Sequence, residues 1–104
     1  MSRKARVRWT QRSIEDLRAI GHYIAEDNPP AARQWLERLR QRAHQAAATP
    51  RAGRRVPELG REDIREVFLR SYRIVYRLAR DGIEVLTVFE GHRLFPEDVL
   101  PEEG

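Results

Sequence analysis

The stretch Tyr72-Arg73-Ile74-Val75-Tyr76-Arg77-Leu78-Ala79 alternates large apolar or aromatic side chains with a second set that includes two arginines. Successive residues of a β-strand point to opposite faces of a sheet, so this period of two predicts a strand. The even-numbered residues would share one face, and the odd-numbered residues, with Arg73 and Arg77, would share the other. The strand therefore has one face suited to a core and one suited to polar contacts.

Two further strands are expected beside residues 72–79. The first covers Ile64–Leu69, and the second covers Ile83–Phe89, which is apolar at nearly every position and so is typical of a central strand. Asp81-Gly82 predicts a two-residue hairpin turn, because both residue types tolerate a positive φ. Residues 51–63 are expected to form a loop, since glycine and proline recur in them.

The first half of the chain predicts a short strand and two helices. Residues 6–9 alternate polar and apolar side chains, and Thr10 is a good N-cap for a helix from Gln11 to about Glu26. Asp27-Asn28-Pro29-Pro30 should end that helix and begin a second one, from about Pro30 to Ala48. A short connection makes the two helices an antiparallel hairpin. Tyr23, Trp35 and Trp9 are expected in the core or at its rim.

Together these elements predict an α+β fold with the order β-α-α-β-β-β. The helical hairpin would pack on one face of a small, mostly antiparallel, curved sheet. A length of 104 residues indicates a single domain, 1–104, in which residues 94–104 form an acidic C-terminal tail. The apolar residues of this tail favour packing against the domain, with a free, partner-binding tail as the alternative.

Composition excludes several classes of protein. The chain has no cysteine, which rules out a disulfide scaffold, a thiolate metal site and a cysteine nucleophile, and fits the reducing cytoplasm. No apolar stretch reaches the roughly 20 residues needed to span a bilayer, so no membrane association is expected. His22 and His44 have no partner at metal-binding spacing, and no phosphate-binding glycine loop or dinucleotide motif is present. We expect neither a metal nor a cofactor.

The charge is distributed unevenly along the chain. The net charge is +4, but residues 94–104 carry −4, which leaves +8 on the rest. A basic body attracts polyanions such as nucleic acid, or an acidic protein. Of the 20 basic residues only Lys4 is a lysine. This arginine bias would also follow from a GC-rich genome.

Three residues are candidates for phosphodiester chemistry. Arginine binds phosphate or carboxylate oxygens with a two-pronged geometry, so Arg73 and Arg77 could hold an RNA or an acidic partner, or simply be solvated on an open sheet face. RNA cleavage also needs a base and an acid, roles that Glu58 and His92 could fill beside Arg73. The spacing of these residues does not show that they meet in the fold.

The order of these elements and several short motifs resemble the ParE/RelE superfamily of type II toxins. The resemblance covers about Val7 to Pro96, and its parts are Trp9-Thr10, Asn28-Pro29, Gly53-Arg54, Val56-Pro57-Glu58, Ile64-Arg65-Glu66, Tyr72–Arg77 and His92-Arg93. ParE-like members are understood to inhibit DNA gyrase and lack a recognised nuclease site, whereas RelE-like members cleave mRNA, usually on the ribosome.

The resemblance also indicates whether the toxin acts on DNA gyrase or on mRNA. Glu58, Arg73 and His92 match the positions of a nuclease site in the YoeB-like branch, but Arg93 replaces the aromatic residue that follows the histidine there, and most of the lysines of RelE-like ribonucleases are absent. We therefore expect a gyrase inhibitor, with a metal-independent mRNA endoribonuclease as the alternative.

A cognate antitoxin is implied in either case, in a toxin–antitoxin hetero-oligomer. Its segment is expected to cover the helical hairpin and the sheet face that carries Arg73. The residues expected to contact a partner are Arg54, Arg65, Arg73, Arg77, His92 and Arg93.

Overall fold

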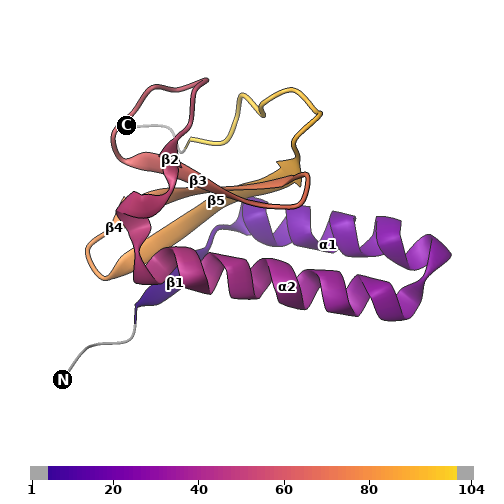
Figure 1. Cartoon of the computed structure of the whole chain (residues 1–104). Coiled ribbons are helices and arrows are strands. Elements are labelled where there is room, and N and C mark those ends of the chain that lie inside the picture. Colours follow the sequence, from indigo (N-terminus) through magenta and orange to yellow (C-terminus); the bar gives the residue numbers. More distant parts are fainter. Residues whose placement is uncertain (1–4, 101–104) are drawn as a thin grey trace.

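The computed structural model describes residues 5–100 and has the expected α+β architecture (Figure 1). The elements follow the predicted order, with a short 3-10 helix, η1, and an additional strand, β2, inserted after the second helix. Their bounds are β1 (Arg6–Trp9), α1 (Gln11–Asp27), α2 (Pro29–Ala48), η1 (Pro50–Ala52), β2 (Arg54–Arg55), β3 (Ile64–Leu69), β4 (Tyr72–Ala79) and β5 (Gly82–Glu90).

The five strands form one sheet in the order β1-β5-β4-β3-β2. The pairs β2–β3, β3–β4 and β4–β5 are antiparallel, whereas β1 runs parallel to β5, so the sheet is mostly antiparallel as expected. The alternating stretch that predicted the fold is β4, the central strand of the sheet. Figure 1 shows α1 and α2 lying side by side against one face of the sheet.

A single residue separates the two helices. Asn28 donates its backbone N–H to the carbonyl of Ile24 at the end of α1, and its side chain accepts a hydrogen bond from the N–H of Ala31 at the start of α2. The four-residue connection predicted from the prolines was therefore wrong, because Pro29 already occupies the first turn of α2, where no N–H is needed. At the other end of α1, Thr10 is the N-cap, as predicted.

The turn between β4 and β5 also differs from the prediction. Ala79 pairs with Gly82, so Arg80 and Asp81 form the turn and Gly82 is the first residue of β5. A Cβ atom at Gly82 would lie 1.9 Å from the carbonyl oxygen of Arg6. Glycine is required there because the backbone of β1 approaches closely, rather than because of the turn.

Both faces of the sheet are covered, which corrects the expected open face. The face toward the helices holds a cluster that includes Leu39, Ile74, Tyr76 and Val85. The opposite face carries a second cluster, in which the segments before and after the antiparallel strands pack on the sheet; its buried members are Val56, Ile64, Val75, Leu86, Phe89 and Val99.

The second cluster is built from two segments whose structure the sequence did not predict. The predicted loop 51–63 contains η1 and β2, and its Val56 and Leu59 pack on the sheet. Residues 95–100 cross the same face and contribute Phe95, Val99 and Leu100, so this part of the acidic tail lies against the domain as expected. Its last residues, 101–104, lie outside the described part. Within residues 5–100 no helix is long and apolar enough to cross a membrane.

We predict that Asn28→Ala lowers the free energy of unfolding by about 1 kcal/mol, because the first turn of α2 loses its side-chain cap. Asn28→Asp keeps an acceptor oxygen and should stay near wild type. Chemical denaturation monitored by circular dichroism measures both. Equal losses in the two variants would contradict a capping role.

Candidate functional site

Arg73 lies at the middle of a charged cluster on the sheet face opposite the helices. Its Nε donates to Glu66 Oε1 at 2.6 Å, and its Nη1 and Nη2 donate to the two carboxylate oxygens of Glu58, each at 2.8 Å. Arg73 is 7% exposed. All three guanidinium nitrogens are thus bound by carboxylates of the chain itself.

Two aromatic rings complete this arrangement. The Arg73 guanidinium carbon is 5.1 Å from the ring centre of Phe89 and 5.5 Å from that of Phe95. The two rings meet edge to face at 5.7 Å. We call Arg73, Glu58, Glu66, Phe89 and Phe95 the Arg73 cluster.

Glu66 extends the cluster toward the edge of the sheet. Its side chain is fully buried, and its second oxygen accepts a hydrogen bond of 2.7 Å from Arg54 Nε. A buried carboxylate loses its hydration, and two guanidinium groups here offset that loss. Arg54 itself stays more than half exposed.

The cluster changes the acidity of Glu58. The hydrogen bonds from Arg73 lower the pKa of Glu58 from 4.5 to about 2. The same contacts, those from Glu58 first, raise the pKa of Arg73. A carboxylate with so low a pKa is a weak proton acceptor near neutral pH.

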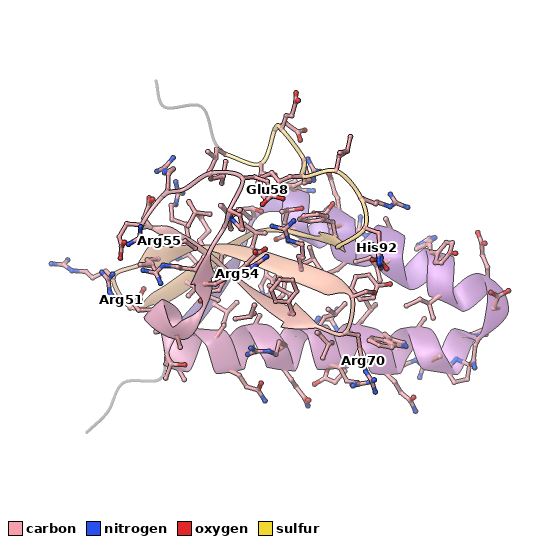
Figure 2. All side chains as sticks on the ribbon, turned by 45° about the horizontal axis from the view of Figure 1, so that its top comes forward. Arg51, Arg54, Arg55, Glu58, Arg70 and His92 are labelled. Carbon is pink, nitrogen blue, oxygen red and sulfur yellow. The ribbon has the colours of Figure 1, made fainter. Side chains whose placement is uncertain are left out.

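His92 has a different partner from the members of this cluster. It follows β5, its side chain is 86% exposed, and its Nδ1 is 2.7 Å from Glu90 Oε1. Figure 2 shows Glu58 and His92 well separated, on different segments. Of the three residues considered for phosphodiester chemistry, the structure therefore pairs Glu58 with Arg73, whereas His92 is exposed and pairs with Glu90. Within residues 5–100, no group of three acidic or histidine side chains is arranged to hold a metal ion.

The remaining candidate arginines have different surroundings. Arg65 is nearly buried and donates to Glu62 and to the carbonyls of Arg51 and Gly53, so it supports the start of the β2 region. Arg77 pairs with Glu84 on the neighbouring strand. These contacts are internal.

A groove of about 630 Å³ that the sequence did not predict runs between α1, the sheet and the C-terminal segment. Tyr23, expected near the core, is 71% exposed at this groove, and Leu94 is 94% exposed. Helical spacing alone could not separate Tyr23 from the buried residues of α1. The groove is lined by side chains that include Asp16, Ile20, Tyr23, Tyr72, Arg93 and Leu94.

We predict that Arg73→Ala lowers the free energy of unfolding by about 3 kcal/mol, the low end for breaking a buried ion pair, since Glu66 keeps Arg54. Arg77→Ala, on the same strand, removes a half-exposed pair and should cost less than about 1 kcal/mol. Urea denaturation measures both variants. Similar losses of unfolding free energy in the two variants would show that the Arg73 cluster stabilises the fold no more than a surface ion pair does.

Glu58 should also make stability depend on pH. Because the pKa of Glu58 is lower in the folded state, its contribution is complete above pH 4.5 and is lost as the pH falls toward 2. The difference in unfolding free energy between wild type and Glu58→Gln should therefore be constant above about pH 5 and shrink below it. A difference that persists down to pH 2 would contradict the pairing with Arg73.

Comparison with known proteins agrees with this architecture. The family model for the ParE toxin of the parDE type II toxin–antitoxin system matches residues 7–95. The chain is 40% identical to the candidate toxin Y4kP of Sinorhizobium fredii, over 93% of this chain and 98% of that protein. It is 34% identical to toxin RelE2 of Caulobacter vibrioides, over 86% of this chain and 99% of that protein.

Among solved structures, a chain of the chromosomal ParDE system from P. aeruginosa has the same fold. The TM-score is 0.68 at 20% identity, over 86% of this chain and 98% of that chain. The match to the family model over most of the chain and the identity to the two relatives lead to one conclusion. The chain belongs to the ParE family of type II toxin–antitoxin toxins.

Proposed function

We propose that this toxin inhibits DNA gyrase through protein contacts, and that a cognate antitoxin neutralises it in the cytoplasm. The observation that supports this most is the state of the Arg73 cluster. Its charged groups bind one another, and the exposed histidine pairs with Glu90 rather than with this cluster. A surface that only has to recognise a protein needs no pair of proton-transferring groups.

Catalysis of RNA cleavage would require these residues to take up a more precise arrangement than recognition of a protein does. A base, an acid and a phosphate-binding cation must all reach one scissile bond. Here Glu58 is bound at both oxygens by Arg73, and Arg73 is nearly buried beneath Phe89 and Phe95. An RNA phosphate would have to displace both carboxylates and the C-terminal segment, which favours inhibition over cleavage.

The groove beside α1 suits recognition of a protein. Tyr23 and Leu94 expose apolar surface there, and Arg93 adds a positive charge. Exposed aromatic and aliphatic side chains around a groove are typical of protein-binding sites. We place the antitoxin or gyrase contact at this groove and at His92 and Arg93 beside it.

The other candidate arginines either contact a partner or stabilise the fold. In this proposal Arg54, which is exposed, remains a partner contact. Arg65, Arg73 and Arg77 hold the fold together, because their guanidinium groups are engaged by carboxylates or carbonyls within the chain.

The test compares gyrase supercoiling and mRNA cleavage with the same purified protein. We expect a stoichiometric amount to block supercoiling of relaxed plasmid and to leave a ribosome-bound mRNA intact. Unaffected supercoiling would overturn the proposal, and mRNA cleavage with intact supercoiling would assign the toxin to the ribonucleases.

The groove can be tested in the same assay. Tyr23→Ala and Leu94→Ala should each raise the concentration needed for half-inhibition several-fold, because contact area is lost without disturbing the core. His22→Ala is the matched control, since His22 is an exposed neighbour of Tyr23 that does not line the groove. Equal effects of all three variants would place the contact elsewhere.

A further inference from the structure

Four arginines lie on α2, on β2 and in the turn between β3 and β4, and none of them lines the groove. We call Arg38, Arg42, Arg54 and Arg70 the arginine stripe. Arg42 Nε donates to the carbonyl of Phe68 at 3.1 Å, and the Arg54 guanidinium lies 5.0 Å from the centre of the Phe68 ring. These contacts tie α2 and β2 to the same exposed residue of β3.

The stripe continues along α2. The Arg38 guanidinium lies 4.8 Å from the ring of Trp35, and this ring contacts Tyr72 of β4 at 6.0 Å. Arg38 and Arg42 are four residues apart, so they are neighbours on one face of the helix. An aromatic ring or a carbonyl therefore orients each of these two guanidinium groups before any ligand binds, which reduces the entropy lost on binding.

Arg70 ends the stripe at the tip of the β3–β4 hairpin. Its φ is +54°, a left-handed conformation that glycine and asparagine adopt far more readily than arginine. Its side chain is exposed and has no acidic partner within residues 5–100. Figure 2 shows Arg54 and Arg70 on the same side of the molecule, at opposite ends of this part of the sheet. An exposed arginine thus occupies a position whose backbone conformation favours glycine or asparagine.

The charge of the stripe is not neutralised. Of its four guanidinium groups, within the described residues only that of Arg54 touches a carboxylate, the buried Glu66 that also binds Arg73. The arginines on the other side of β2 differ, because Arg51, Arg55 and Arg65 all bind Glu62. The stripe is therefore a positive surface, and three of its four guanidinium groups have no carboxylate partner within the described residues.

We propose that the arginine stripe binds the phosphate backbone of duplex DNA. None of its four arginines lines the groove beside α1, so a peptide would find its apolar pocket there rather than at the stripe. A row of oriented guanidinium groups instead matches a row of phosphates, which arginine binds with two-pronged geometry. This goes beyond gyrase inhibition, because it predicts affinity for DNA without gyrase and would hold the toxin on the substrate of a topoisomerase.

The experiment measures the fluorescence anisotropy of a labelled DNA duplex of about 20 base pairs. The full chain is added at a range of salt concentrations. Arg38→Gln/Arg42→Gln should weaken binding about tenfold at 0.1 M salt and reduce the slope of log K against log salt by about 2. The matched control is Arg33→Gln/Arg40→Gln, which removes the same charge from another face of α2. It should weaken binding about twofold or less.

A second variant separates binding from folding. Arg70→Asn suits the left-handed backbone, so it should raise the melting temperature while weakening DNA binding. Equal weakening by the two double variants would overturn the proposal, since net charge alone would then explain binding. The proposal would also be overturned if polyglutamate bound to the stripe more tightly than DNA does, because that result would assign the stripe to an acidic protein. No gyrase is present, so this result is independent of the supercoiling test.

Discussion

The guanidinium group of Arg73 joins β3, the segment after β2, and aromatic residues of β5 and the C-terminal segment. It binds Glu66 on the neighbouring strand, Glu58 in the segment after β2, and the rings of Phe89 in β5 and Phe95 in the C-terminal segment. It adds to the apolar contacts of the two covering segments and to other polar contacts, such as the ion pair between Arg12 and Asp98. Arg73 therefore helps to place the C-terminal segment, which forms one wall of the groove beside α1.

The desolvation cost of burying these charged groups is offset because positive and negative groups alternate along the cluster. Arg54, Glu66, Arg73 and Glu58 follow one another, and each inner member binds two groups of opposite charge. A buried ion pair adds little to stability when compared with an apolar core of similar shape, but it is costly to break. The cluster thus acts mainly by specifying which segments meet, while the apolar clusters on both faces supply most of the stabilisation.

Periodicity predicted the helices, the three long strands and the two faces of β4, because these depend on residues near one another in sequence. It could not predict that the Arg73 face is covered, since Val56 and Val99 reach that face from segments without a regular pattern. The exposure of Tyr23 was missed for a related reason: whether a residue on the apolar side of a helix is buried depends on how far the sheet extends beneath it. Glu58 and Arg73 were identified as site candidates, but their pairing and the contribution of Glu66, Phe89 and Phe95 were not.

That pairing changes what the matching positions mean. Glu58 and Arg73 stand where the resemblance places the nuclease residues of other toxins, yet here they bind each other and close over the sheet. The same two residue types can thus serve a reaction when they face solvent and an internal contact when a segment covers them. Residue identity at these positions cannot decide the target, whereas accessibility can. Among the described residues, the accessible surfaces include the groove beside α1 and the arginine stripe, on which the two proposals rest.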